Sequence, residues 1–193
     1  MITQIKGKLV EKTPTQVVVD CNGIGYEINI SLYTFSSLSS DENIKLFTHL
    51  QVREDAHILY GFFTVLERAV FRLLISVSGI GTSTARTMLS SLTPIEIQHA
   101  IGIEDVATIQ GIKGIGLKTA QRVIIELKDK IKTLQGTEEI PILKSNTIKE
   151  ETLSALEVLG YSRKASEKIV DKLIQGEPDS SVEGLIKSAL NKL

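Results

Sequence analysis

Hydrophobic and polar positions alternate through the first 62 residues in the way expected of β-strands. β-Branched residues fill Gln16–Cys21, and this run ends at Asn22-Gly23, a dipeptide typical of a tight hairpin turn. Apolar side chains recur at every second position over residues 26–30. Two further strands are expected near residues 44–52 and 56–63, joined by a charged turn. Together with the N-terminal segment, the pattern predicts five short strands.

A short interruption near residues 32–38 separates the third predicted strand from the fourth. Five short strands with such an interruption fit a small closed barrel of the oligonucleotide/oligosaccharide-binding kind, the OB-fold. The strand pattern alone leaves a generic five-stranded sheet open as the alternative.

The period changes to that of helices at Thr64. Thr64 and Glu67 have the spacing of a capping box, and so do Thr93 and Glu96, with Pro94 at the first helical position. The long helix after Gly116 is expected to bury one face made of Ala120, Val123, Ile124, Leu127, Ile131 and Leu134.

A segment without a sustained period, residues 137–147, is expected to be a flexible linker. Three helical patterns follow it, capped by Thr147, preceded by Ser162 and capped near Ser180-Ser181. The predicted domains are therefore a barrel over residues 1–62, a helical domain over 63–136 and a three-helix domain over 148–193.

Charge is unevenly distributed among these segments. The 193 residues carry a net charge of −1, with 42% hydrophobic and 23% charged residues, proportions typical of a globular protein. Residues 1–62 hold 5 Lys and Arg against 7 Asp and Glu, and residues 137–193 hold 8 against 10. Residues 63–136 hold 9 against 6, a net charge of +3. A polyanionic partner is therefore expected at the middle segment.

The middle segment contains an internal repeat. Ser78-Gly79-Ile80-Gly81-Thr82 recurs 35 residues later as Lys113-Gly114-Ile115-Gly116-Leu117, each time between two predicted helices. Two glycines in three residues allow a tight turn and a close approach of the backbone to a partner. We expect the second glycine of each copy to need a positive φ, and the isoleucine to anchor the turn. The unpaired amides of the following helix then form a site for a phosphate group.

Three other interpretations of the repeat compete with phosphate binding. A nucleotide-binding P-loop needs a lysine directly after its last glycine, but Leu117 intervenes before Lys118, and no strand precedes the motif. A dinucleotide-binding fingerprint needs a third glycine, where this chain has Thr119. Glycines that only form tight helix–helix turns explain one copy more readily than two copies in a basic segment.

These motifs, in this order, give the chain a full-length resemblance to the RuvA family of bacterial Holliday junction branch-migration proteins. The residues that carry it are Val52-Arg53-Glu54-Asp55-Ala56, Leu59-Tyr60-Gly61-Phe62, the two glycine hairpins, Ala155-Leu156 and Leu159-Gly160-Tyr161.

The resemblance implies an α+β multidomain protein, with an N-terminal five-stranded OB-fold barrel, two helix-hairpin-helix motifs and a C-terminal three-helix bundle. It implies a non-catalytic subunit that binds four-way DNA junctions without sequence preference, as a homotetramer or as an octamer of two tetramers. It further implies that the subunit recruits a RuvB-type hexameric ATPase for branch migration, with a junction resolvase in the same complex, during recombination, DNA repair and the SOS response.

The resemblance also assigns roles to individual residues. Glu54 and Asp55 are expected to form an acidic pin at the centre of the junction, and Leu156, Leu159 and Tyr161 to contact the motor. The expected phosphate-binding residues are Gly79, Gly81, Thr82, Ser83, Gly114, Gly116, Lys118, Thr119 and Arg122.

The first hairpin departs from the family pattern, which commonly continues Gly-Pro-Lys after the apolar residue. Here Thr82 and Ser83 follow Gly81, so a phosphate-facing positive charge is missing there. The second hairpin keeps Lys118, and Arg122 lies one turn further on the same helix face. We therefore expect the second hairpin to contribute more of the electrostatic binding.

No arrangement of residues indicates catalysis or a cofactor. His49, His57 and His99 are scattered, and Cys21 is the single cysteine, so no metal site or internal disulfide is expected. No secretory signal or membrane-spanning stretch is visible, so a bacterial cytoplasmic location is expected. Two rival hypotheses remain: a DNA glycosylase or nuclease that carries the same hairpins, and hairpins that serve only protein contacts.

Overall fold

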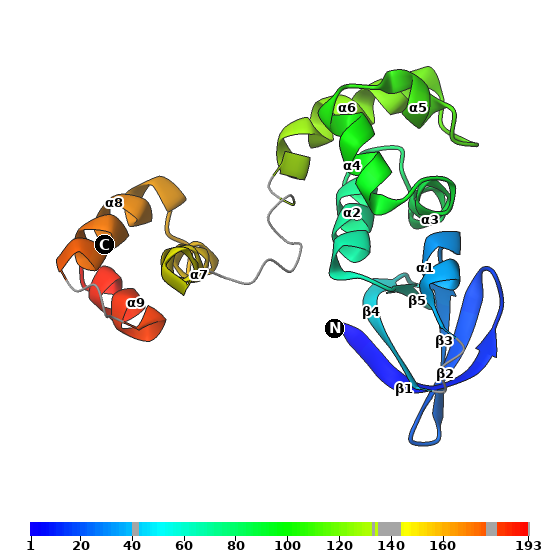
Figure 1. Ribbon diagram of the computed structural model, residues 1–193, viewed down its shortest axis with the longest axis horizontal. Coiled ribbons are helices and arrows are strands. Elements are labelled where there is room, and N and C mark those ends of the chain that lie inside the picture. The colour runs from blue at the N-terminus through cyan, green and yellow to red at the C-terminus, as the bar shows by residue number, and fades with distance from the viewer. Residues whose placement is uncertain (40–42, 133, 135–143, 177–180, 193) are drawn as a thin grey trace. The chain divides into compact units, whose positions relative to one another are not determined.

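The chain divides into two compact units, Met1–Glu138 and Glu139–Leu193. The computed structural model describes residues 1–39, 43–132, 134, 144–176 and 181–192 (Figure 1).

The first unit begins with a closed five-stranded barrel. Its strands are β1 (Gln4–Lys12), β2 (Gln16–Cys21), β3 (Ile24–Ile30), β4 (Asn43–Val52) and β5 (His57–Phe62). They follow the order β1-β2-β3-β5-β4 around the barrel, and β4 pairs with β1 to close it. All pairs are antiparallel except β3 with β5. The predicted OB-fold barrel is confirmed.

Alternation of side chains explains why these segments close around a core. Val17 and Val19 on β2 and Ile28 and Ile30 on β3 are fully buried inside the barrel, while Val18 and Asn29, which alternate with them, are only half-buried. The predicted interruption is the short helix α1 (Leu32–Ser37), between β3 and β4. The turn between β2 and β3 has positive φ at both central residues, as Asn-Gly hairpin turns require.

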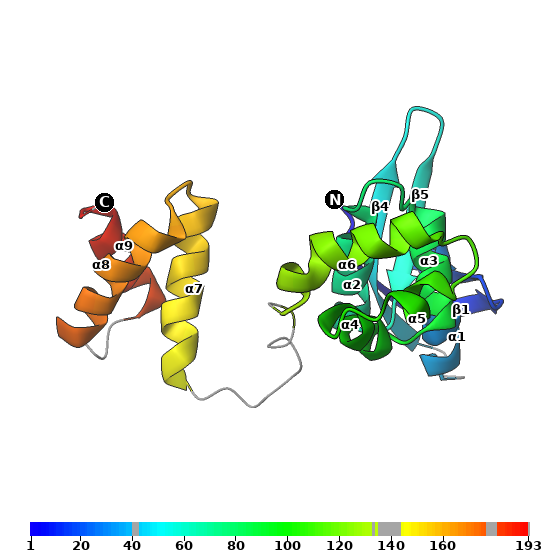
Figure 2. The same cartoon turned by 90° about the horizontal axis from the view of Figure 1, so that it is seen from above.

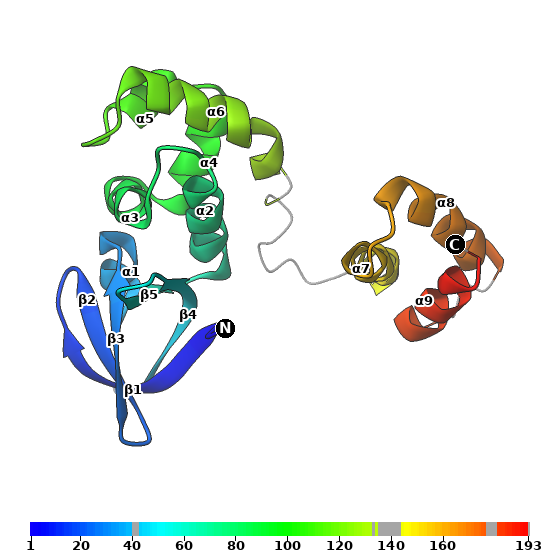
Figure 3. The ribbon, with the colours of Figure 1, turned by 180° about the vertical axis from the view of Figure 1, so that it is seen from behind.

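Five helices of the described chain continue the first unit from one end of the barrel (Figures 1 and 3). They are α2 (Val65–Ile75), α3 (Thr82–Ser91), α4 (Pro94–Gly102), α5 (Val106–Gln110) and α6 (Leu117–Lys132). The capping box of α4 is present as expected. On α6, the predicted apolar face is buried from Ala120 to Ile131, and Leu134 packs partly buried against the same core.

One aromatic side chain joins the barrel to the helices. Phe71 of α2 is fully buried, and its ring centroid lies 4.8 Å from that of Phe62 and 5.2 Å from that of Tyr60, both on β5. The same core includes apolar side chains of α3, α4, α5 and α6. Tyr60 and Phe62 therefore belong to the hydrophobic core of the helices, whereas the interior of the barrel forms a core of its own.

A buried carboxylate forms a second link between barrel and helices. Glu67 accepts hydrogen bonds from the hydroxyls of Ser31 and Thr34 at α1, at 2.5 and 2.6 Å, and from the Phe63 amide at 3.0 Å. Thr64 caps α2 as predicted, but the reciprocal half of the expected capping box is wrong. The Glu67 carboxylate instead accepts hydrogen bonds from the Ser31 and Thr34 hydroxyls and from the Phe63 amide, and not from the Thr64 amide as a capping box requires.

The second unit is a small helical domain. The helices α7 (Lys144–Val158), α8 (Arg163–Gly176) and α9 (Val182–Leu190) each pack against the other two. Their shared core contains Leu153, Leu156, Val170, Leu173, Leu185 and Ala189. Ser162 precedes α8, and Ser181 caps α9, as predicted.

The start of α7 differs from the prediction. This helix begins at Lys144, so the expected N-cap at Thr147 is wrong, and the last residues of the predicted linker are helical. The remaining linker residues, 137–143, lie outside the described residues.

The stability of the first unit should depend on pH through Glu67. Burial raises the pKa of this carboxyl above its ordinary value of 4.5, so the folded chain holds the proton more tightly than the unfolded chain does. The free energy of unfolding, relative to that of Glu67→Gln, should therefore fall as pH rises from about 4.5 through the raised pKa. Urea denaturation of both proteins across this interval measures the difference, and a constant difference would contradict this prediction.

Candidate nucleic-acid interface

The two glycine hairpins have the same backbone geometry. In the first, Gly79 has φ +95° and the Ile80 amide donates to the Val77 carbonyl at 3.1 Å. In the second, Gly114 has φ +90° and the Ile115 amide makes the equivalent bond to Ile112 at 3.0 Å. Both isoleucines are buried, so they anchor their turns as predicted.

The positive φ lies at the first glycine of each hairpin, which corrects the prediction for the second. Gly81 has φ −84°, and Gly116 does not have a positive φ either. A Cβ atom added at Gly79, Gly81, Gly114 or Gly116 would meet nothing within 4 Å. Gly81 and Gly116 are therefore required neither by backbone strain nor by crowding within the protein. An added side chain there would affect only a partner that approaches from outside.

Both hairpins lead directly into the N-terminus of a helix. The first backbone hydrogen bonds there run from the Ala85 amide to the Gly81 carbonyl and from the Ala120 amide to the Gly116 carbonyl, each at 2.9 Å. The amides of residues 82–84 and 117–119 precede these bonds. No side chain caps α3. Such amides, together with the positive end of the helix dipole, suit an anionic oxygen.

The Thr82 hydroxyl does not face outward as expected for phosphate contact. It accepts a hydrogen bond from the Tyr60 hydroxyl at 2.9 Å and donates one to the Gln51 side chain at 3.0 Å. Ser83 is exposed, whereas Thr119 at the second hairpin is half-buried. At the first hairpin, the groups available to a partner are therefore the backbone amides and the Ser83 hydroxyl.

Positive charge gathers at the second hairpin. Lys118 and Arg122 are exposed and line one shallow surface depression with Gln121, Ile125 and Glu126. The Arg122 guanidinium also donates to the Ser78 carbonyl at 3.2 Å, so it links the second hairpin's helix to the first hairpin.

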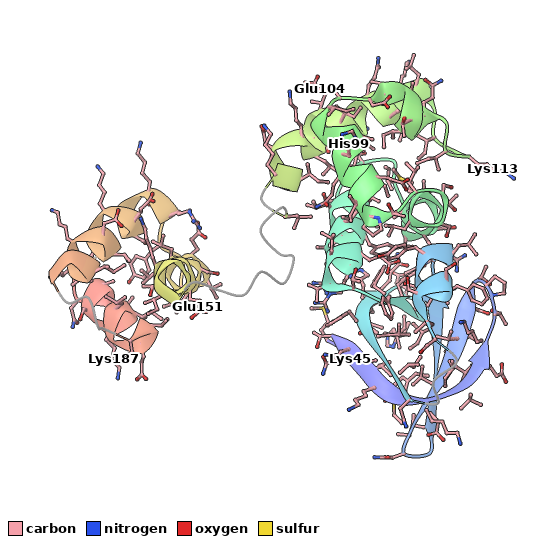
Figure 4. All side chains as sticks on the ribbon, viewed as in Figure 1. Lys45, His99, Glu104, Lys113, Glu151 and Lys187 are labelled. Atoms are coloured by element: carbon pink, nitrogen blue, oxygen red, sulfur yellow. The ribbon has the colours of Figure 1, made fainter. Side chains whose placement is uncertain are left out.

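Lys113 was not among the residues predicted from the sequence. Figure 4 shows it extending from the outer end of the α5–α6 loop, and it is exposed. Its position directly before Gly114 in the repeat could have indicated a positive charge beside the second hairpin.

Glu54 and Asp55 occupy the tip of the β4–β5 hairpin, which projects from the rest of the first unit (Figure 2). A backbone bond from the Arg53 amide to the Ala56 carbonyl, 2.9 Å long, closes the turn. Both carboxylates are exposed. The Arg53 Nε lies 3.1 Å from the Asp55 Oδ1, so this ion pair offsets part of the charge of Asp55. The sequence analysis did not predict this ion pair. We call residues 53–56 the acidic turn.

Comparison with known proteins accounts for the order of these parts. Three family descriptions match the chain: "RuvA N terminal domain" over residues 1–61, "SAM-like Helix-hairpin-helix tandem" over 71–129, and "RuvA, C-terminal domain" over 147–193. The chain belongs to the RuvA family.

Curated RuvA proteins match over the full length. Identity is 60% with the protein of Christiangramia forsetii and 58% with that of Flavobacterium psychrophilum, and 100% of both chains is covered in each case. The protein of Bacteroides thetaiotaomicron is 46% identical, again over the whole of both chains. Each is named "Holliday junction branch migration complex subunit RuvA".

Within the RuvA C-terminal domain, the structure separates the predicted motor-contact residues. Leu156 is fully buried in the core of the second unit, so it does not belong to an exposed surface. Leu159 and Tyr161 are 56% and 38% exposed, around a turn in which Gly160 has φ +96°. Val158, which the sequence interpretation omitted, is 86% exposed beside them.

The described residues contain no group of three or more His, Cys, Asp or Glu side chains that could hold a metal ion. Over the same residues, no helix has the length and apolar character needed to cross a membrane. The thiol of Cys21 is partly buried and donates to the Lys6 carbonyl at 3.3 Å.

The two glycines of each hairpin should differ in their effect on folding. Gly79→Ala and Gly114→Ala should each destabilise the protein by about 1–2 kcal/mol, because a Cβ opposes the left-handed conformation. Gly81→Ala and Gly116→Ala, which face open space without a positive φ, serve as matched controls and should cost less, since at Gly81 only the weaker N-cap preference of alanine opposes the change. Chemical denaturation measures all four variants, and equal losses at both glycines of a hairpin would contradict the assignment.

Proposed function

We propose that this RuvA-family chain is a DNA-binding subunit that recognises four-way junctions by their structure and not by their sequence. It acts as a homotetramer, holds the junction open, and recruits a RuvB-type hexameric ATPase that drives branch migration. The observation that carries this proposal is the pair of hairpins with matching geometry, open glycines and outward helix amides, in one unit with the acidic turn. The printed names of its relatives support it.

The hairpins bind phosphate oxygens through their backbone. Gly81 and Gly116 leave room for the phosphodiester chain, and the amides at the starts of α3 and α6 donate to it. Lys118 and Lys113 add positive charge at the second hairpin, and Glu126, whose Oε1 lies 3.7 Å from the Arg122 Nε, offsets part of the charge that Arg122 adds. Since backbone oxygens are the same in every sequence, these contacts fix the position of the DNA without selecting bases.

The acidic turn supplies selectivity by repulsion. Glu54 and Asp55 lie at the end of a projecting hairpin, where their charges oppose phosphates that come close. In a fourfold assembly with this turn at the centre, continuous duplex crossing the centre is disfavoured, while the open crossover of a junction leaves space for the turns. Affinity is lost for both substrates, but more for duplex.

The C-terminal domain provides the contact with the motor. Val158, Leu159 and Tyr161 form an exposed apolar surface around the Gly160 turn. Exposed apolar side chains in a small domain suit a protein partner. The same complex accommodates a junction resolvase.

A gel shift with the full-length chain tests the function. Synthetic four-way junction and linear duplex of the same sequence are compared at one salt concentration, with and without magnesium. Tighter binding of the junction, without cleavage, is the expected result. Cleavage would favour the nuclease hypothesis, and absence of any shift would favour hairpins that serve only protein contacts.

The second hairpin should contribute more to electrostatic binding than the first. Lys118→Ala should weaken junction binding and reduce the slope of log affinity against log salt by about 1, as expected for one lost phosphate contact. Ser83→Ala should change either quantity little. Lys128→Ala is the matched control on the same helix, because Lys128 pairs with Glu104. Equal losses from Lys118→Ala and Ser83→Ala would refute the asymmetry.

Neutralising the acidic turn should reduce the preference for junctions. In the variant Glu54→Gln with Asp55→Asn, duplex affinity should rise, because repulsion of phosphates is removed. The ratio of duplex to junction dissociation constants should then fall. Glu11→Gln with Glu27→Gln, two exposed barrel carboxylates outside this turn, is the control and should leave the ratio unchanged. An unchanged ratio in the acidic-turn variant would mean that the turn is only solvated surface.

Motor stimulation should depend on the exposed side chains and not on direct contact by Leu156. Leu159→Ala with Tyr161→Ala should abolish stimulation of the ATPase while leaving junction binding intact. Leu156→Ala should instead unfold the C-terminal domain, since it removes a fully buried side chain at a cost of about 2–5 kcal/mol. Circular dichroism separates the two effects. Full stimulation by the double variant would disprove this contact surface.

A further inference from the structure

Three hydrogen-bonding side chains connect the first hairpin to the strands that carry the acidic turn. The Tyr60 hydroxyl of β5 donates to the Thr82 hydroxyl at 2.9 Å, and Thr82 donates in turn to the side-chain oxygen of Gln51 on β4 at 3.0 Å. Thr82 is the first residue after the hairpin's second glycine. The chain of bonds therefore runs from the start of α3 to both strands of the β4–β5 hairpin.

The anchor of this connection is held firmly. Tyr60 is only 7% exposed, and its ring packs against the fully buried Phe71. In the β4–β5 ladder, Gln51 pairs with Ile58 and Tyr60 pairs with His49, so both anchoring residues sit in regular strand near the acidic turn. A hydroxyl that accepts one bond and donates another polarises both, which strengthens the chain.

A second contact holds the same helix to the barrel. Arg86, one turn along α3, donates to the Asn29 side chain of β3 at 2.8 Å. The second hairpin differs here, because the residue equivalent to Thr82 is Leu117, an apolar side chain that is 50% exposed. The Thr82 connection to β4 and β5 is therefore specific to the first hairpin.

We propose that Thr82 is a positioning residue, which through Tyr60 and Gln51 holds the first hairpin at a fixed distance from the acidic turn and so sets the selectivity for junctions. This inference rests on the proposed function. An attracting group and a repelling group discriminate between two DNA shapes only while their separation is fixed. If the hairpin moves relative to the turn, duplex can reach the amides without approaching the carboxylates.

The test uses the full-length chain with Tyr60→Phe, Thr82→Val and the double variant. Thr82→Ser keeps the hydroxyl and serves as the conservative variant. Tyr26→Phe, which removes a hydroxyl elsewhere on the barrel, is the matched control. For each protein, the dissociation constants for junction and duplex are measured at one salt concentration. Amide hydrogen exchange of residues 85–89, which lie within α3 from its first backbone hydrogen bond onward, is followed in the absence of DNA, and denaturation reports stability.

Tyr60→Phe, which removes one of the two hydrogen bonds, is expected to lower the duplex-to-junction ratio of dissociation constants about 3- to 10-fold, the scale of one hydrogen bond. Thr82→Val, which removes both, should lower the ratio at least as far. The double variant should fall no further than Thr82→Val, because that change alone already removes both hydrogen bonds of the connection. Exchange at the start of α3 should become faster in all three. Thr82→Ser and Tyr26→Phe should retain the wild-type ratio and exchange.

Two results would overturn the positioning role. One is an unchanged ratio in Thr82→Val, which lacks both hydrogen bonds. The other is an equal loss of affinity for junction and duplex in Thr82→Val, which would indicate direct phosphate contact by the hydroxyl. Failure of the proposed function is distinguishable, since the wild type would then show no junction preference. Even then, amide exchange in α3 still tests the hydrogen-bonded connection, because an exchange rate unchanged by Tyr60→Phe would show that the Tyr60 hydroxyl does not hold the start of α3.

Discussion

The packing of α2 on the end of the barrel is the contact on which the geometry of the first unit depends. Phe71 of α2 lies against Tyr60 and Phe62 of β5, and the same hydrophobic core continues into the helices that carry both hairpins. Because close-packed interiors move little, this contact fixes α2 relative to β5, and the Thr82 hydroxyl then holds the first hairpin to the same strand. Glu67 reinforces the contact by receiving three hydrogen bonds across it.

The two hairpins share a backbone geometry but have different surroundings. The first is held to the barrel by the Thr82 hydroxyl and has few charges of its own, whereas the second has Lys113 and Lys118 facing outward. Arg122 connects the two by donating to Ser78. In the function we propose, one hairpin sets the position of the DNA and the other supplies more of the attraction.

Local patterns in the sequence predicted much of the fold, because strand alternation, capping residues and glycine turns act over a few positions. The strands, the buried hairpin isoleucines and the Thr93 cap are confirmed for this reason. Long-range partners were missed. Glu67 meets Ser31 across 36 positions, and Thr82 meets Tyr60 across 22, and no local pattern encodes such pairs.

Two further predictions were wrong, one about which side chains of α7 are exposed and one about which glycine of each hairpin has a positive φ. Leu156 and Leu159 are three positions apart, but α7 ends at Val158, so the first is buried and the second lies beyond the helix. The assignment of positive φ to the second glycine failed because Gly-Ile-Gly does not state which glycine turns the chain; the structure gives that role to Gly79 and Gly114. The central claim is that the hairpins bind phosphates through backbone amides. Gly81→Val with Gly116→Val tests it most directly, since no charge changes and no protein atom lies in the way. The account predicts a folded variant with a cooperative unfolding curve, somewhat less stable because valine is a poor N-cap at Gly81, together with loss of junction binding in a gel shift. Normal junction binding by the folded variant would contradict it.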